Sequence, residues 1–112
     1  MTTGRAFEIL VTLANLKETG KLGYAIAKQR RLLEMELTEF IAIRNQAIVN
    51  HSDGGKMSEE DIAKANAEIS EYVNLPCDFP VYKISEEVFT SGSLTAQQMY
   101  ELDFMVGDAN AE

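Results

Sequence analysis

The sequence predicts a mainly α protein: a long antiparallel helical hairpin, a third helix, and a small C-terminal segment with a short strand and a short helix. Three observations lead to this prediction. Apolar residues recur at helical spacing over two long stretches. The second stretch contains no proline and no glycine after Gly23, and pairs of glycines mark the expected turns.

The first predicted helix covers residues 4–18. Its apolar face contains Phe7, Leu10, Val11 and Ala14. These positions are three or four residues apart, which places them on one side of a helix. Gly20 and Gly23 follow, and we expect a turn there because glycine commonly ends a helix and lets the chain reverse.

The second predicted helix, over residues 22–50, is the longest element. At about 1.5 Å per residue it would be about 42 Å long, whereas a compact domain of this size is only about 35 Å across. The first helix, at about 15 residues, can cover only about half of this length, so the third helix or a second copy of the chain must cover the rest of its wide apolar face. We predict a homo-oligomer, a dimer, formed through Ile26, Arg30, Leu33, Leu37, Phe40, Arg44 and Ile48.

Two arginines project from this apolar face, Arg30 and Arg44. One interpretation is an interface ion pair with a carboxylate from the acidic half of the chain or from another subunit. The other is that the aliphatic stem covers the core while the guanidinium reaches water. The substitution Arg44→Met separates the two, because only an interface residue should change the oligomeric state.

The third predicted helix begins at Ser58, after a loop rich in glycine. Ser58 is a capping residue, and the acidic residues that follow it complement the positive end of the helix. Pro76 and Pro80 end the helical pattern, because proline disfavours helix at the residue before it. We expect this helix and the C-terminal segment to pack across the hairpin.

The C-terminal segment is predicted to contain a short strand, a helical turn and a last helix, followed by a tail. Residues 81–84 alternate as a strand does, and residues 85–89 form a capped helical turn. Thr95 and Gln98 form a capping box that opens a last helix, which runs to about residue 106. We expect one helical domain over residues 1–107 and a disordered acidic tail over residues 108–112.

Charge is distributed unevenly along the 112 residues, whose formal net charge is −8. Residues 1–56 carry eight basic and six acidic side chains, and residues 57–112 carry two basic and twelve acidic ones. This excess argues against direct nucleic-acid binding, which depends on cations that neutralise phosphates. We predict an acidic surface for a protein partner, formed by Glu59, Glu60, Asp61, Glu68, Glu71, Glu86 and Glu87. The alternative is that the acidic excess only keeps the protein soluble.

The composition also bears on cellular location. No apolar stretch is long enough to span a membrane, and the start of the sequence has no signal-peptide pattern. A single cysteine fits a reducing compartment. We therefore expect a cytoplasmic protein without membrane association.

No set of residues predicts catalysis, a cofactor or a metal. His51 lacks ligand partners at suitable spacing. The loop from His51 to Lys56 fails both the phosphate-loop and the EF-hand pattern at required positions, so we interpret it as a turn between helices. Cys77 has no basic neighbour in sequence, and Asp78 should raise its pKa, which argues against a nucleophilic role.

Two stretches carry a resemblance to a known family. Residues 16–21, Leu-Lys-Glu-Thr-Gly-Lys, precede a long charged amphipathic helix, and residues 81–84, Val-Tyr-Lys-Ile, precede a small final helix. In both respects the chain resembles a family of short, uncharacterised bacteriophage and prophage proteins. It departs from them after the glycine turn, where their basic run is diluted to residues 24–28. The resemblance implies no catalytic residues and no cofactor, and favours a phage-encoded protein in the bacterial cytoplasm.

These observations favour a non-catalytic protein that acts through protein–protein contact, as a structural or assembly factor. The alternative is an acidic inhibitor that mimics nucleic acid and blocks the basic cleft of a host defence protein. Salt separates the two, because binding by a mimic should weaken steeply between about 50 and 200 mM salt. An enzyme ranks third.

Overall fold

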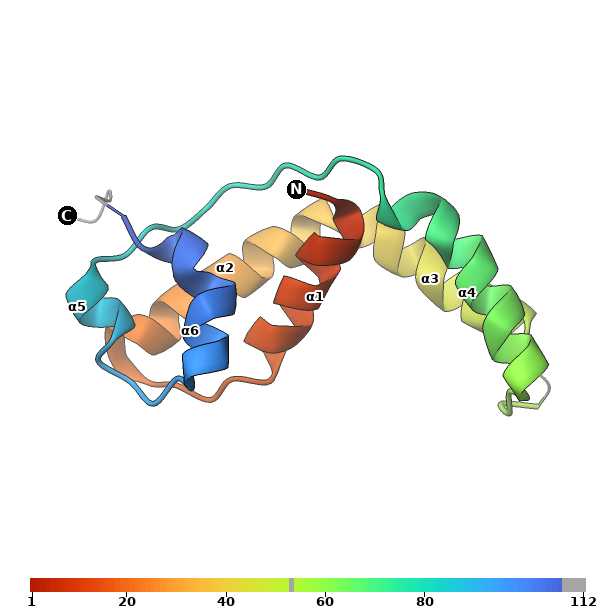
Figure 1. Ribbon diagram of the computed structural model, residues 1–112, viewed down its shortest axis with the longest axis horizontal. Coiled ribbons are helices and arrows are strands. Elements are labelled where there is room, and N and C mark those ends of the chain that lie inside the picture. The colour runs from red at the N-terminus through yellow and green to blue at the C-terminus, as the bar shows by residue number, and fades with distance from the viewer. Residues whose placement is uncertain (53, 108–112) are drawn as a thin grey trace.

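The computed structural model describes residues 1–52 and 54–107 and confirms the mainly α fold (Figure 1). The helical elements are α1 (Thr3–Ala14), α2 (Gly20–Glu36), α3 (Thr38–Asn50), α4 (Glu59–Val73), α5 (Glu86–Phe89), α6 (Ala96–Leu102) and the 3-10 turn η1 (Asp103–Met105). The predicted tail, residues 108–112, lies outside the described residues. None of the helices described is both long enough and apolar enough to cross a membrane.

The helices form two successive hairpins. Helix α1 packs against α2, and α4 packs against α3 (Figure 1). The first hairpin agrees with the prediction. Helix α4, in contrast, lies chiefly along α3 instead of across the first hairpin, and touches α1 near Gly4 and Val73. The apolar face of the long helical stretch is thus covered by two partners within the same chain, α1 and α4.

The predicted single helix over residues 22–50 is interrupted at Leu37. The Thr38 hydroxyl donates to the carbonyl oxygens of Glu34 and Met35, each at 3.0 Å. A hydroxyl bound back to the preceding turn in this way bends a helix. Backbone hydrogen bonds continue from Leu37 to Leu33 (2.8 Å) and from Ile41 to Leu37 (2.9 Å), so the chain bends there without reversing.

The turn between α1 and α2 lies earlier than predicted. Helix α1 ends at Ala14, four residues before the expected end, and α2 already begins at Gly20. Gly20 has a φ of 70°, which suits glycine. Gly23 lies inside α2, where a Cβ atom would overlap the carbonyl group of Glu18. Gly23 therefore permits the close approach of the connecting turn, and does not end a helix.

The predicted strand over residues 81–84 is wrong. This stretch is extended, and its bridge partner is the C-terminal segment, through Ile84 and Val106. The capping predictions are confirmed: Ser58 forms a capping box with Asp61, Ser85 caps α5, and Thr95 forms a capping box with Gln98. The final α-helix ends at Leu102, and η1 continues the chain to Met105.

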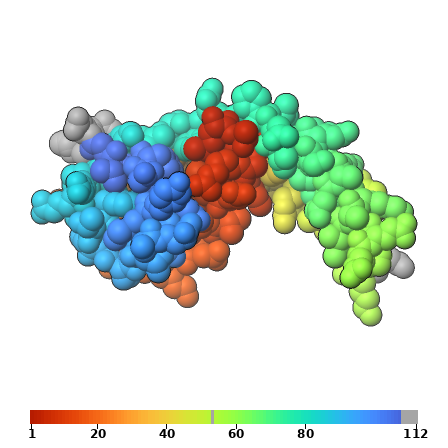
Figure 2. Space-filling view, viewed as in Figure 1, coloured from red at the N-terminus to blue at the C-terminus, as the bar shows by residue number. Residues whose placement is uncertain are grey.

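The molecule has a thick end and a thin arm. Its extents are 49 × 26 × 20 Å and its radius of gyration is 16.3 Å, above the roughly 13 Å expected for a compact chain of this length. The thick end contains α1, α2, α5 and α6, and the hairpin of α3 and α4 projects from it as an arm (Figure 2). The largest fully buried side chains are Ile9, Leu13, Leu22, Leu33, Leu37, Leu102, Met105 and Gln29.

Candidate protein-interaction surface

The residues considered for catalysis or metal binding are separated in the structure. His51 Nε2 lies 3.1 Å from a carboxylate oxygen of Glu68, a contact that ties the end of α3 to α4. Cys77 is buried, and this burial, with the nearby Glu36 and Asp78 carboxylates, raises the pKa of its thiol. Among residues 1–52 and 54–107, no three His, Cys, Asp or Glu side chains converge as metal ligands.

Most of the apolar residues predicted to face a second copy are packed inside the chain. Ile26, Leu33, Leu37 and Phe40 belong to its own core. Ile48 is half-buried on α3. Arg30 is exposed on α2 and pairs with Glu34 at 3.4 Å. A second copy would therefore have to use residues outside the apolar face of α2 and α3.

Arg44 is engaged with α1. Its guanidinium lies over the ring of Phe7, 5.1 Å from the ring centroid. Phe7 in turn meets Phe40 edge to face at 5.5 Å. The guanidinium of Arg44 thus makes a cation–π contact within its own chain, which favours the interpretation in which Arg44 packs on the core over an ion pair with another subunit.

The seven acidic residues predicted to form a partner surface do not lie together. Glu86 and Glu87 lie on α5 at the end opposite the arm, whereas the other five lie on α4 (Figure 1). Within α4 their roles also differ. Asp61 accepts a hydrogen bond from the backbone N–H of Ser58 at 3.1 Å, and Glu68 faces His51.

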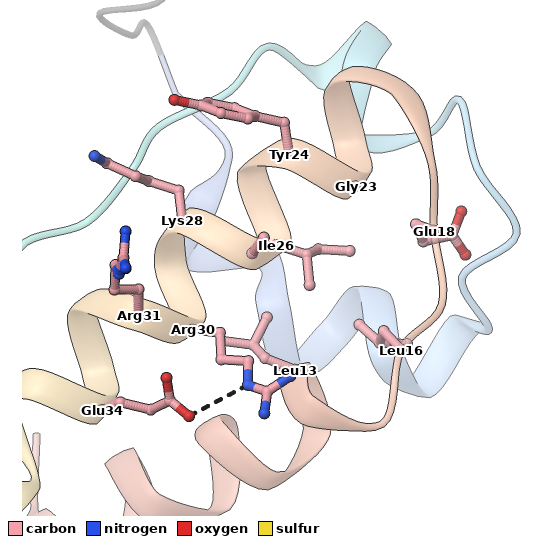
Figure 3. Close-up of a pocket in the computed structure, with 11 residues that line it drawn as sticks. Leu13, Leu16, Glu18, Gly23, Tyr24, Ile26, Lys28, Arg30, Arg31 and Glu34 are labelled. Atoms are coloured by element: carbon pink, nitrogen blue, oxygen red, sulfur yellow. Dashed lines mark hydrogen bonds and ion pairs between the residues drawn. The ribbon is translucent and has the colours of Figure 1, made fainter.

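The exposed side of α2 has a different character. Five residues at successive spacings of three or four form one stripe along the helix, which we call the basic stripe: Lys21, Tyr24, Lys28, Arg31 and Met35. Tyr24 and Met35 are 61% and 69% exposed, although both are large and apolar. Figure 3 shows Tyr24, Lys28 and Arg31 projecting away from Leu13 and Leu16. None of the five positions is acidic.

Two hollows flank Tyr24. The first, of about 540 Å³, is lined by apolar residues of α1 and α2, including Leu13 and Ile26, and by charged residues of α2 (Figure 3). The second, of about 740 Å³, lies between α2 and the extended segment, and Tyr82 and Val88 contribute to its wall. Tyr24 and Tyr82 meet edge to face there at 5.9 Å. The stripe is thus bordered by space that a partner's side chains could fill.

Gln29 positions the wall of the second hollow. Its side chain is fully buried, donates to the carbonyl oxygen of Pro80 at 3.0 Å and accepts from the backbone N–H of Tyr82 at 2.7 Å. Gln29 was not among the predicted site residues, although a glutamine on the apolar side of an amphipathic helix is a signal that its amide has a partner. The basic stripe was not among the predicted sites either, although its spacing is visible in the sequence.

Comparison with known proteins adds no relative. No protein-family model, no curated protein and no solved structure matches the chain. The geometry of the described residues is therefore the basis for a functional proposal.

Proposed function

We propose that this protein is a non-catalytic assembly factor that binds a carboxylate-bearing protein surface through the basic stripe. The observation that carries the proposal is the juxtaposition of Tyr24 and Met35, both largely exposed, with Lys21, Lys28 and Arg31 on one side of α2. Tyr, Met and Arg are enriched in protein interfaces relative to other surfaces. Exposed apolar side chains interleaved with cations suit a partner that is both apolar and acidic.

The elongated shape supports an assembly role. The arm formed by α3 and α4 projects from the thick end of the molecule (Figure 1), and the side chains of the basic stripe on α2 are exposed. A body with separate exposed surfaces can contact two neighbours at once. The resemblance of the sequence to short phage and prophage proteins favours such a role in a bacterial cytoplasm, without membrane or direct nucleic-acid contact.

The second candidate is an acidic inhibitor that mimics nucleic acid. The observation that favours it is the set of five carboxylates on α4. Since Glu86 and Glu87 lie at the other end of the molecule, α4 alone would have to imitate the phosphate row. Asp61 and Glu68 are already engaged within the chain, which leaves few free carboxylates for that purpose.

The experiment is chemical cross-linking in a bacterial lysate, followed by mass spectrometry of the linked peptides. We expect cross-links from Lys21 and Lys28 to an acidic partner protein, and their loss in the double variant Tyr24→Ser, Arg31→Glu. The matched control, Tyr100→Ser with Arg5→Glu, alters an exposed tyrosine and a partly exposed arginine outside the stripe and should keep the cross-links. Equal capture by both variants would refute the proposal. A partner that the stripe variant still captures, but that is lost when Glu60 and Glu71 are replaced, would favour the inhibitor.

A further inference from the structure

Helix α4 presents an outer face with a carboxylate at each end, two alanines between them and the exposed Lys64 beside the alanines. Glu60, Ala63, Ala67 and Glu71 follow one another at spacings of three or four and are all exposed. They therefore lie in one row on the side of α4 that faces away from α3. Alanine side chains leave a shallow depression along a helix, into which larger side chains of a neighbouring helix can pack.

The basic stripe has the complementary pattern. Lys21 and Arg31 are ten residues apart, and Glu60 and Glu71 are eleven apart, which is about 15 and 16 Å along a helix. When the two rows are laid side by side in the same direction, a cation meets a carboxylate at both ends and Lys28 meets Ala67, whereas in the opposite direction Lys28 would face Lys64. Tyr24 then lies over the small alanines of α4, where a large ring has room.

The two rows cannot meet within one molecule. Helix α2 lies in the thick end and α4 in the arm of a body 49 Å long (Figures 1 and 2), and the larger helix–helix contacts of the described residues pair α2 with α1, α3 and α5 and not with α4. Both rows are open to solvent. The contact they allow is therefore between molecules.

We propose that the occupant of the basic stripe is α4 of a second copy of this chain, in a head-to-tail arrangement. The inference rests on the proposed interaction role of the stripe and names its partner. Because the two surfaces differ, the contact is heterologous: in a pair, one copy keeps an unused α4 face and the other an unused stripe, so the assembly grows as a ring or an open chain.

The contacts that α4 makes within its own chain leave Glu60 and Glu71 available for the stripe of another copy. Glu60 is paired with Lys64 at 3.3 Å, but both side chains are more than half exposed, and such surface pairs contribute little. No hydrogen bond or ion pair within the described residues engages the Glu71 side chain. The attraction between stripe and α4 is electrostatic at its ends, so it should weaken with salt.

The test uses two charge-reversed variants of the full chain and sedimentation velocity. Variant one carries Lys21→Glu and Arg31→Glu, and variant two carries Glu60→Lys and Glu71→Lys. We expect wild type to self-associate and each variant alone to sediment as a monomer, because like charges then face one another. An equimolar mixture should associate again, since each altered surface finds its complement in the other variant. Circular dichroism checks that both variants are folded.

The outcomes are distinct. Recovery in the mixture, together with at least about tenfold weaker association of wild type at 200 mM than at 50 mM salt, supports the inference. A wild-type protein that stays monomeric up to about 1 mM overturns it, as does a mixture that remains monomeric. If the stripe still gives cross-links to another acidic protein in that case, the proposed function survives while the second copy is excluded. Binding of nucleic acid by the stripe would overturn both.

Discussion

The substitution Gln29→Met tests whether one buried amide holds the extended segment against α2. Methionine has nearly the volume of glutamine, so the change leaves no cavity but removes both hydrogen bonds of the side chain. The Pro80 carbonyl and the Tyr82 N–H remain in place without their partner. Leaving a buried backbone group unsatisfied costs about 1–3 kcal/mol.

The loss affects the Pro80 carbonyl and the Tyr82 N–H unequally. Pro80 is exposed, so its carbonyl can accept a hydrogen bond from water, whereas Tyr82 is half-buried. We therefore count chiefly the Tyr82 N–H and expect Gln29→Met to lower the free energy of unfolding by about 1–3 kcal/mol. That is a large fraction of the 5–15 kcal/mol typical of a domain.

Urea unfolding measured by circular dichroism gives the free energy, and amide hydrogen exchange reports on Tyr82 directly. The matched control is Gln46→Met, because Gln46 donates only to Asn50 on the exposed side of α3. The control should change stability by less than about 0.5 kcal/mol. Equal stability of both variants, with the Tyr82 amide as protected as in wild type, would refute the assignment.

Three further predictions follow from individual contacts. Gly23→Ala should lower the free energy of unfolding by about 1–3 kcal/mol, because the alanine Cβ would overlap the Glu18 carbonyl. An unchanged midpoint of thermal unfolding would contradict this. Arg44→Met should lower the free energy of unfolding by about 0.5–1 kcal/mol through loss of the contact with Phe7, with no change in sedimentation. Hydrogen bonds with Ser58 lower the pKa of Asp61 below 3.8. The ionised carboxylate therefore stabilises α4 fully above pH 3.8, and this stabilisation is lost as the pH falls through the lowered pKa. An NMR titration of Asp61 should show this, and a midpoint above 3.8 would exclude it.

Local signals in the sequence were sufficient for the ends of several helices. Ser58 was predicted as a cap and Thr95 with Gln98 as a capping box, and the structure has a capping box at both positions. These predictions succeeded because all the groups involved lie within one helical turn. The same reasoning gave the α fold, since apolar spacing determines which face of each helix is buried.

The bend at Leu37 could not be predicted in this way. No proline or glycine lies there, and a threonine such as Thr38 is common in helices that continue straight. The apolar pattern runs across the bend without a change of phase, because Leu37 itself is buried at the junction. Only the packing of α1 on one side and α4 on the other shows that the two segments point in different directions.

The failed strand prediction has a related cause. Residues 81–84 alternate as a strand does, but backbone hydrogen bonds need a partner, and the partner of Tyr82 is a side chain fifty-three positions earlier in the chain. A contact of that separation leaves no trace in a local pattern. The second hollow depends on it, so its position could not be predicted either. The basic stripe is different: its spacing of three and four is visible in the sequence.

The bend also changes the kind of self-association to expect. A straight helix over residues 22–50 would have left an apolar face for a second copy, and that contact would depend little on salt. In the structure α1 and α4 cover this face, and its central residues are buried within the chain. What remains for a partner is the outer side of each helix, where cations lie on α2 and carboxylates on α4. Association through these surfaces must therefore respond to ionic strength, and association that does not would point to a surface other than these two.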